Sequence, residues 1–482
     1  MPLLKFLYWS PYFLPILFIP HAIIHYFKQL VKEEYLLKRR QFLNSLSPKV
    51  DQHPPNIVGF FHPYCAAGGG GERVLWQSVK FCLERWEYIV CAIYTGDDLT
   101  KEEMVNRVKD RFNISLDVNR IDLVHLKRRG WVEASKYPIL TILGQSLGSV
   151  LLGYEAIGLL IPDVFIDTMG YSFTYPVVKL LTGVPVLAYV HYPTISAEMI
   201  ASAQSQDLNA VNNATSIVKL IPGLSYLKLV YYKVFAWIYA WTGSFCDQAM
   251  LNSSWTLGHI SAMWYSTCKV VYPPCDIDSF TSTNSDRTLS IVSLAQFRPE
   301  KNHALQLHTL ATLFQKHPNL KTEGLKLYVM GSVRNDADQK RVDELMELRE
   351  ELNLTNNVEF VVNASYTEIK KYLSTSLIGL HTMKLEHFGI SVVELMCSGL
   401  ITIANDSGGP QMDIIPPKDS NCYPGGYLAS TANEYSELIH HVISLGEDEK
   451  SKIRKNAIEW CSKFSNEEYE KGFEQSLSNF LN

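Results

Sequence analysis

Short apolar runs alternate with longer stretches of helical periodicity through most of this chain. Each apolar run has the length of a buried strand, and turn-forming residues separate it from the amphipathic stretch that follows. Such alternation is typical of parallel, doubly wound sheets whose two faces are covered by helices. We therefore predict an α/β fold with strands that include Tyr88–Thr95, Ile121–Leu126, Asp163–Thr168, Val184–His191 and Ile378–Met383.

The pattern falls into two parts on either side of a proline pair. The chain has 482 residues, of which 47% are hydrophobic, so it exceeds one ordinary domain and can bury more than one core. Pro273 and Pro274 mark a linker. We predict a first Rossmann-like domain over residues 50–272 and a second over residues 284–455.

Residues 3–27 form an apolar stretch that is long enough to cross a bilayer. A cluster of lysines and arginines follows it, and the positive-inside rule then predicts a membrane anchor at residues 1–30 with the downstream chain in the cytosol. A cleaved signal peptide is one alternative, although no small-residue cleavage site follows the stretch. A tilted or interfacial helix is another, because prolines interrupt the segment.

Two internal apolar segments raise the same question. Residues 139–161 are long enough to span a membrane, but Gln145 and Glu155 interrupt them and a strand follows directly, which favours a buried helix. Residues 217–243 combine Leu, Tyr and Trp with lysines, which is typical of helices that lie in a membrane interface. We predict membrane contact for this second segment, with an ordinary core helix as the alternative.

Composition narrows the class of protein. The net charge is −5, so the chain lacks the basic character expected of a partner for nucleic acid. Its 9 cysteines are scattered without a C-x-x-C pair, which predicts reduced thiols rather than a disulfide framework or a zinc site. Several N-x-S/T sequons are present, and we expect them to stay unmodified in a cytosolic fold.

The segment 381–410 carries the clearest candidate site. Glu386 lies in the turn after a predicted strand, Gly389 opens a helix, and Glu394 lies inside that helix. Parallel sheets bind ligands at the carboxyl ends of their strands, and a helix N-terminus there attracts a phosphate. A second turn, 405–410, can close the same crevice. These features predict a nucleotide-sugar site in which one carboxylate reaches the sugar and the other the ribose. Two solvated surface acids are the alternative.

Other strand ends carry basic residues and a further glycine. Arg298 and Lys301 are suited to hold a diphosphate, and Gly331 follows the next predicted strand, where the nucleotide would lie. Asp276 and Asp278 form a D-x-D string after the linker. We interpret this string as structural rather than as a metal site.

In the first predicted domain, a run of glycines at residues 68–71 follows a strand. Gly70 and Gly71 let the backbone approach a ligand, and a helix predicted to begin at Arg73 points its N-terminus at the same place. The spacing differs from that of dinucleotide-binding and ATP-binding loops. His191 also follows a buried strand and is predicted to lie at the ligand edge, with a satisfied core histidine as the alternative.

Together these motifs resemble one enzyme family. HFGISVVELMCSGL followed by IANDSGGP is similar to the donor-binding signature of the retaining GT-B glycosyltransferases of family four. With GGGGER, HYPTIS and FRPEKNH behind an N-terminal anchor, the chain most closely resembles the GDP-mannose-dependent α-1,2-mannosyltransferases of dolichol-linked oligosaccharide assembly. The resemblance covers nearly all of the chain from Asn56 onward.

The resemblance implies a GT-B fold, in which two Rossmann-like domains face a cleft and residues 456–482 cross back onto the first domain. It implies transfer of the fourth and fifth mannoses from GDP-mannose to a dolichol-diphosphate oligosaccharide on the cytosolic face of the endoplasmic reticulum membrane, without a metal or other cofactor. Other mannosyltransferases of the pathway are candidate partners.

The resemblance also assigns roles to residues. His191 and Glu386 are the implied catalytic residues, with His191 beside the transferred sugar. The implied acceptor loop contains Gly70, Gly71 and Arg73. The residues implied to bind the donor are Arg298, Lys301, Gly331, Gly389 and Glu394.

Two alternatives stay open at this level. One is a transferase of the same fold that uses a UDP-sugar, and the other is a catalytically silent subunit that recruits a partner transferase to the membrane. The basic turn also departs from the family pattern, because Arg298 lies only three residues before Lys301 and Gln296 stands where an arginine is common. Which cation holds which phosphate therefore stays open as well.

Overall fold

The computed structural model describes residues 34–46, 55–196, 199, 224–281, 287–415 and 425–481. The predicted anchor at 1–30 and the first part of the predicted interfacial segment, 217–223, lie outside these residues. The chain divides into two compact units. The first contains the described residues up to Leu251 together with His259–Lys269 and the residues from Phe473 onward. The second contains Asn252–Gly258 and Val270–Gly472.

The first unit is built on a parallel sheet of seven strands in the order β3-β2-β1-β4-β5-β6-β7. Because β1 lies between β2 and β4, the strand order reverses at that point, and ligands of open α/β sheets bind at such a position. The bounds of these strands are Asn56–Phe61 (β1), Ile89–Thr95 (β2), Ile121–His125 (β3), Val164–Asp167 (β4), Val186–Val190 (β5), Gln248–Leu251 (β6) and Thr267–Val270 (β7).

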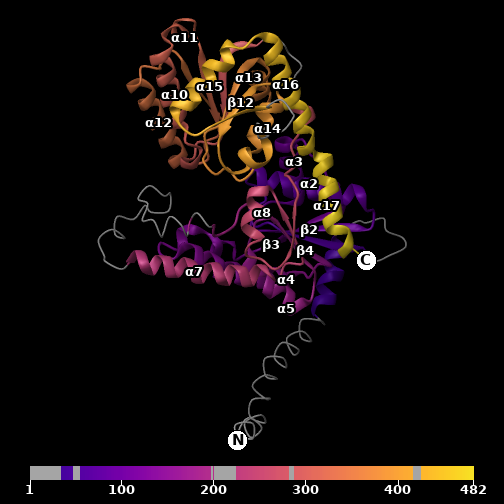
Figure 1. Ribbon diagram of the computed structural model, residues 1–482. Helices are drawn as coiled ribbons and strands as arrows, with labels where there is room; N and C mark the ends of the chain where they lie inside the picture. Colours follow the sequence, from indigo (N-terminus) through magenta and orange to yellow (C-terminus); the bar gives the residue numbers. More distant parts are fainter. Residues whose placement is uncertain are drawn as a thin grey trace, which may run out of the picture. The chain divides into compact units, whose positions relative to one another are not determined.

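The helices of the first half of the chain follow the strands as predicted for βαβ units (Figure 1). The predicted start of the helix after the glycine run was wrong: the helix begins at Gly70 rather than at Arg73, so the last two glycines lie in its first turn. The helices are Gly70–Arg85 (α2), Lys101–Phe112 (α3), Thr141–Leu159 (α4), Tyr175–Thr182 (α5), Leu224–Gly243 (α7) and Ser254–Ile260 (α8).

The second unit is a parallel sheet of six strands in the order β10-β9-β8-β11-β12-β13. The predicted strand at 378–383 lies at 376–380, so the residues from His381 onward belong to the turn. The strand bounds are Thr288–Leu294 (β8), Lys326–Gly331 (β9), Val358–Val362 (β10), Ser376–Leu380 (β11), Ile401–Asn405 (β12) and Gly426–Ala429 (β13).

Helices cover both faces of this second sheet. Ile291 and Val292 are neighbours in β8, yet they belong to two different buried apolar clusters. Because successive strand side chains point to opposite faces, the two clusters lie on opposite sides of the sheet. The helices are Ile277–Phe280 (α9), His303–Lys316 (α10), Pro318–Thr322 (α11), Asp336–Glu351 (α12), Tyr366–Thr375 (α13), Ile390–Cys397 (α14), Ala432–Ser444 (α15), Glu447–Cys461 (α16) and Asn466–Leu477 (α17).

The end of α17 belongs to the first unit. Phe473 packs edge to face against Phe81 of α2 with 6.1 Å between ring centroids. Nearby, Arg85 Nε donates to Glu474 Oε1 at 2.6 Å. The last helix thus contributes both an apolar and a charged contact to the outer side of α2.

The apolar helix α4 has two unlike faces. Leu152, Ala156 and Ile157 are buried against the first unit, whereas Leu147 and Leu151 are exposed. By length and composition, α4 is the one helix among the described residues that is apolar enough to cross a membrane, a test that core helices of soluble proteins also pass. The prediction that residues 139–161 form a buried helix is therefore correct for one face of α4 and wrong for the other.

Candidate functional site

The turn after β11 places Glu386 beside a lysine and a histidine. Lys301 Nζ lies 2.5 Å from Glu386 Oε2, and His381 Nε2 lies 3.2 Å from the same oxygen. The Glu386 side chain is only 12% exposed. Burial by itself would raise the pKa of Glu386, but the charge of Lys301 and the contact with His381 hold it well below its usual range. Glu386 is therefore a fixed carboxylate that accepts hydrogen bonds and does not serve as an acid.

The second predicted turn contacts the first directly. Gly409 N donates to Glu386 O at 2.7 Å, and Leu385 N donates to Ser407 Oγ, also at 2.7 Å. Gly408 has a φ of +61°, and a Cβ there would lie 2.2 Å from Glu386 O. Glycine is required at this position both by the backbone conformation and by the space. The second turn thus holds the backbone of the first at two points, the N–H of Leu385 and the carbonyl oxygen of Glu386.

Lys301 is held in place by the strand ends around it. It closes a short 3-10 turn, Pro299–Lys301, and Thr382 Oγ1 donates to its carbonyl oxygen at 3.0 Å. Gln306 of α10 is buried and donates to Thr382 Oγ1 at 3.0 Å. The basic turn after β8 and the acidic turn after β11 are therefore tied together through Thr382.

Arg298 lies in the same turn but has a different partner. Its Nη1 is 3.8 Å from Glu300 Oε1, whereas Lys301 carries the contact with Glu386. The Nε of Arg298 is buried and lacks a hydrogen-bond partner among the residues that the structure describes. Buried guanidinium donors are normally paired, so this N–H is available to an anion.

Gly331 ends β9, where the backbone of the neighbouring strand end comes very close. A Cβ at Gly331 would lie 2.2 Å from Ala295 O, so no larger residue fits without displacing that backbone. Asn363 N donates to Gly331 O at 2.8 Å and Val333 N donates to Asn363 Oδ1 at 2.9 Å. Gly331 therefore shapes the turn after β9, between the ends of β8 and β10.

Gly389 and Glu394 take the predicted positions in the helix that follows Glu386. Gly389 precedes α14 with a φ of +110°, a conformation that favours glycine. Glu394 is half-buried among the apolar residues of α14, next to the buried Val393 and Leu395. The structure thus brings Glu386, Lys301 and the start of α14 together, with Glu394 one turn further into the helix.

Sequence reasoning missed two buried residues of this region. His381 was quoted only as the start of a motif, and Gln306 was not singled out, although both are polar residues in otherwise apolar surroundings. A polar residue directly after a buried strand, as His381 is, was the available signal.

His303, the first residue of α10, predicts an acid sensitivity of the fold. Burial, and next the charge of Lys301, lower the pKa of His303 to about 4. Below pH 6.5 the unfolded chain binds a proton at His303 that the folded chain does not bind until about pH 4. We therefore expect this residue to reduce the free energy of unfolding by about 3 kcal/mol between pH 7 and pH 4.

The measurement is unfolding by urea across this pH range for wild type and His303→Gln. The variant should lose part of the acid sensitivity, while His308→Gln, at an exposed position of the same helix, should keep all of it. Equal pH dependence in wild type and His303→Gln would contradict the expectation.

In the first unit, the strand ends converge on the N-terminus of α2. Gly69 N donates to Glu72 Oε2 at 2.6 Å, which caps the helix. Glu72 Oε1 lies 3.7 Å from Nε2 of the fully buried His62, and Nδ1 of His62 contacts Thr168 Oγ1 at 2.7 Å. Burial would raise the pKa of Glu72, but His62 and the backbone amides lower it. The glycine loop is thereby anchored to the ends of β1 and β4.

His191 lies at the same edge of the sheet, directly after β5. Its Nε2 contacts Thr168 O at 3.2 Å, and a Cβ placed on Gly71 would lie 3.5 Å from that nitrogen. The structure therefore brings together His191 and the predicted loop residues Gly70 and Gly71, with half-buried Arg73 in the next position but one. Sequence reasoning missed His62 and Glu72, which support this loop.

The D-x-D string has a structural partner. Asp276 Oδ1 accepts from Ser279 N at 3.4 Å and so caps the short helix α9. Over the described residues, no group of three or more His, Cys, Asp or Glu side chains is arranged to hold a metal ion.

Solved structures share this architecture. The Anabaena protein HepE, crystallised in complex with UDP and glucose, is 16% identical and gives a TM-score of 0.59, with 88% of this chain and 100% of HepE covered. Sucrose-phosphate synthase from Thermosynechococcus elongatus is 14% identical and gives a TM-score of 0.63, with 88% and 98% covered. At this identity the likeness concerns the fold, and the predicted GT-B fold is confirmed.

Sequence comparison is more specific. Residues 55–264 match the family model described as ALG11 mannosyltransferase N-terminus, and residues 276–460 match that of glycosyl transferases group 1. Proteins named GDP-Man:Man(3)GlcNAc(2)-PP-Dol alpha-1,2-mannosyltransferase are 44% identical in Xenopus laevis, covering 88% of this chain and 87% of the relative, and 43% identical in Homo sapiens, covering 92% and 90%. This chain belongs to the ALG11 family of alpha-1,2-mannosyltransferases.

Proposed function

We propose that this protein transfers mannose from GDP-mannose to a dolichol-diphosphate-linked oligosaccharide and adds the fourth and fifth mannoses in α-1,2 linkage. The observation that carries the proposal is the fixed Glu386–Lys301 pair at the start of α14, in a chain that is 38–44% identical to enzymes with that printed activity. The names of those relatives specify GDP-mannose, so a UDP-sugar donor and a catalytically silent subunit are not favoured.

In this proposal the second unit binds the donor. Lys301 and Arg298 neutralise the diphosphate, and the buried Nε of Arg298 gains the hydrogen-bond acceptor that it lacks among the described residues. Free backbone N–H groups at the start of α14, the positive end of the helix dipole, also attract the diphosphate. Gly331 and Gly389 keep the strand-end turns free of side chains, Glu386 accepts hydrogen bonds from the mannose hydroxyls, and Glu394 accepts them from the ribose.

The chemical step is retaining transfer in which charge develops on the departing diphosphate. The bond from C1 of mannose to the phosphate oxygen breaks, and its electron pair stays on GDP. The acceptor hydroxyl forms the new bond to C1 on the same face and gives its proton to a leaving phosphate oxygen. Lys301 and Arg298 stabilise the growing negative charge, which makes them more effective in the transition state than in the ground state.

Glu386 is excluded from both roles that carboxyl groups have in retaining glycosidases. Those enzymes need a protonated carboxylic acid as well as a nucleophilic carboxylate. The low pKa of Glu386 leaves it without a proton to donate, and its oxygen is already shared by Lys301 and His381. His191 instead stabilises the reacting mannose, next to an acceptor loop that comprises Gly70, Gly71 and Arg73. We further propose that Lys301 and Arg298 neutralise the diphosphate without the help of a metal ion.

The experiment that tests this function is transfer of labelled mannose from GDP-mannose to a synthetic trimannosyl lipid diphosphate. Parallel reactions contain EDTA, UDP-glucose as donor, or no acceptor. Transfer from GDP-mannose that persists in EDTA supports the donor and the metal-independent step together. Activity that EDTA abolishes would overturn the metal-independent step alone, and transfer only from the UDP-sugar would overturn the donor.

We also propose that the protein works on the endoplasmic reticulum membrane, with its catalytic units on the cytosolic side. Helix α7 carries apolar side chains on its exposed side as well as on its buried side, with Lys228 and Lys233 among them. Tyr232, Phe235 and Tyr239 form its buried stripe, while Trp237 is 71% exposed and Trp241 is 51% exposed. Exposed tryptophans on an apolar helix are unfavourable in water. Together with the exposed apolar residues of α4, they suit contact with a lipid surface.

Charges on the exposed stripe of α7 should separate membrane docking from chemistry. We expect Trp237→Glu combined with Trp241→Glu to reduce transfer to an acceptor in liposomes by about tenfold. The double variant loses the binding energy of two tryptophans in the lipid interface and must bring two carboxylates into it. Transfer to a water-soluble, short-chain acceptor should be unchanged. The control is Tyr265→Glu, since Tyr265 is 94% exposed outside α4 and α7. Equal losses with both acceptors would contradict membrane docking by this stripe.

A further inference from the structure

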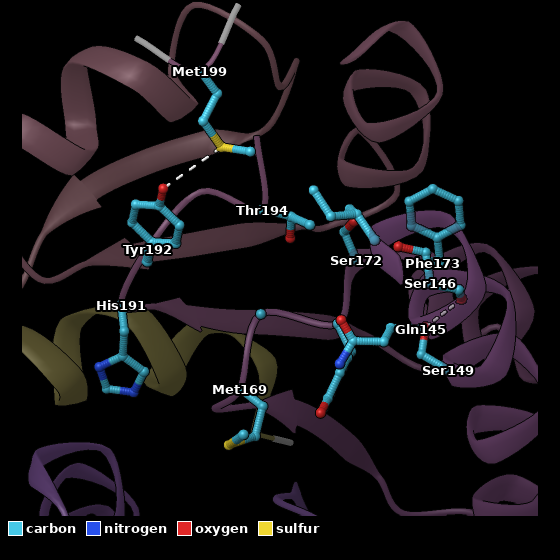
Figure 2. A pocket seen from close by; sticks show the side chains of 13 residues that line it. Gln145, Ser146, Ser149, Met169, Ser172, Phe173, His191, Tyr192, Thr194 and Met199 are labelled. Atoms are coloured by element: carbon cyan, nitrogen blue, oxygen red, sulfur yellow. Dashed lines mark hydrogen bonds between the residues drawn. The ribbon is translucent and has the colours of Figure 1, made fainter. Parts of the chain in front are cut away.

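A cavity of about 430 Å³ lies within the first unit, beside His191. Figure 2 shows that it is surrounded by side chains of α4 and of the loops that follow β4 and β5. Its volume falls within the range of roughly 300–1,000 Å³ that is typical of small-molecule sites. The donor site described above is built from the second unit and makes no use of this cavity.

The position of the cavity relates it to the transfer chemistry. His191 contributes to its wall and also lies against Gly71 in the glycine loop. One end of a ligand in the cavity would therefore lie beside His191, the residue that we propose to stabilise the reacting mannose. A parallel sheet binds ligands at this edge, where β4 and β5 end.

The lining has a distinct chemistry. It combines hydroxyl and amide groups, including those of Gln145, Ser149 and Thr194, with the rings of Tyr171, Phe173 and Tyr192. The lining set contains no Lys, Arg, Asp or Glu. A diphosphate needs cations or a cluster of N–H donors, so the lining does not suit it. Aromatic faces with a few placed polar groups suit a neutral ligand that carries many hydroxyls.

The polar groups are held in fixed orientations. Gln145 Nε2 donates to Val132 O at 2.8 Å, which orients the amide so that its oxygen and its second N–H can serve a ligand. Ser149 Oγ donates to Ser146 O at 2.7 Å. Tyr171 is packed edge to face on Phe61 with 6.1 Å between ring centroids. Preorganised walls reduce the entropic cost of binding.

The cavity borders the apolar side of the unit. Ile142 is part of the lining, and the next residue, Leu143, donates its backbone N–H to Tyr231 Oη of α7 at 3.2 Å. One end of the cavity thus adjoins α4 and α7, whose exposed residues we assign to the membrane. A ligand with a neutral polar end and a lipid end could occupy both places.

We propose that this cavity binds the uncharged sugar end of the oligosaccharide acceptor and directs its terminal hydroxyl toward His191. The proposal rests on the proposed function, because the acceptor is the substrate assigned there. The diphosphate and lipid of the acceptor remain outside the cavity, on the side of α4 and α7. Gln145 and Thr194 are specificity-determining residues that hydrogen-bond mannose hydroxyls.

The test compares Gln145→Leu and Thr194→Val with wild type in transfer of labelled mannose to a short-chain trimannosyl lipid diphosphate. Each variant should raise the acceptor KM by about tenfold, equivalent to about 1.4 kcal/mol, because a hydrogen bond to a substrate hydroxyl is lost. The KM for GDP-mannose and the slow hydrolysis of GDP-mannose without acceptor should stay unchanged. Thr194→Val is nearly isosteric, so it keeps the test intact if Gln145→Leu fails to fold. Gln339→Leu, at an exposed position of α12, is the matched control.

The outcomes separate this inference from the function on which it rests. An active wild type with unchanged acceptor KM in both variants overturns the cavity assignment and leaves the function intact. An increase in KM that appears only with a long-chain lipid acceptor also overturns it, because the occupant would then be the lipid. A wild type that transfers no mannose to the acceptor overturns the proposed function, and this occupant with it.

Discussion

Replacing Glu386 with glutamine is expected to lower kcat for mannose transfer by about 10²-fold to 10³-fold, the loss typical of removing one preorganised electrostatic contact. Glutamine preserves the shape of the side chain but removes its charge. Lys301 then loses the negative charge of the partner that lies 2.5 Å away, and His381 contacts a neutral amide group, a weaker acceptor than the carboxylate oxygen that lies 3.2 Å from its Nε2. The position of the cation that faces the diphosphate changes at the same time as the hydrogen bonds to mannose.

A neighbouring acid provides the control for this substitution. Glu300 lies in the same turn as Lys301 but pairs with Arg298 at 3.8 Å, and its side chain is 38% exposed. Glu300→Gln should keep kcat within about twofold of wild type, because exposed ion pairs contribute little. A Glu386→Gln variant with wild-type kcat would contradict the assigned role of this carboxylate.

A double-mutant cycle gives a sharper readout. If Lys301 and Glu386 act as one unit, Lys301→Met should cost much less in the Glu386→Gln background than in wild type. The pH profile is a second check: since the pKa of Glu386 is held well below its usual range, wild-type activity between pH 5 and pH 8 should show no limb from its titration. If the losses of kcat in the two single variants simply add in the double variant, Lys301 and Glu386 act independently, which would contradict the expectation.

Gly408→Ala is expected to have the second-largest effect, on both stability and donor binding. Gly408 has a φ of +61°, and an added Cβ would lie 2.2 Å from Glu386 O. The backbone conformation alone costs about 1–2 kcal/mol for a non-glycine residue. The steric contact must be relieved as well, by a shift of the turn that carries Glu386 or of the turn that carries Gly408, and either shift changes how the two turns fit together. We therefore expect a loss of stability above 2 kcal/mol and a KM for GDP-mannose that rises about tenfold or more.

Two other glycines separate the contributions to this effect. Gly324 has a φ of +83° with nothing within 4 Å of an added Cβ, so Gly324→Ala reports the backbone cost alone. Gly446, the N-cap of α16, has a φ of −66° and equally open surroundings. Alanine is a poorer N-cap than glycine but restricts the unfolded chain, so the two effects of Gly446→Ala oppose each other and its net effect should stay below about 1 kcal/mol. Urea unfolding and donor KM are measured for all three. If Gly408→Ala and Gly324→Ala lower the stability equally and leave the same KM for GDP-mannose, the close approach of Gly408 to the Glu386 turn contributes to neither quantity.

Much of the fold could be predicted because its signals are local. The alternation of strand and helix patterns gave two doubly wound parallel sheets, and most strand ends were placed within two residues. Helix starts were less secure. The glycine run was expected to precede a helix beginning at Arg73, but Glu72 caps Gly69 and draws Gly70 and Gly71 into the first turn. A capping contact across three residues outweighed the low helix propensity of glycine.

The candidate site could be predicted in part. Glu386, Gly389 and Lys301 were recognisable because each follows a strand pattern in a turn of characteristic composition. Sequence alone left open which of Arg298 and Lys301 holds which phosphate. The structure distinguishes them, because Thr382 and the buried Gln306 orient the turn so that Lys301 meets Glu386 while Arg298 pairs with Glu300.

The sequence by itself determined the fold class, the strand-end positions of Glu386 and His191, and the apolar character of α4 and α7, because each depends on residues close together in the chain. Only the tertiary structure decided that Lys301 pairs with Glu386, 85 residues away, that His62 supports the loop beside His191, and that a neutral cavity lies next to that histidine. These relations depend on the order of strands within each sheet. Hydrophobic periodicity specifies which face of a strand is buried, but it carries no information on which strands become neighbours.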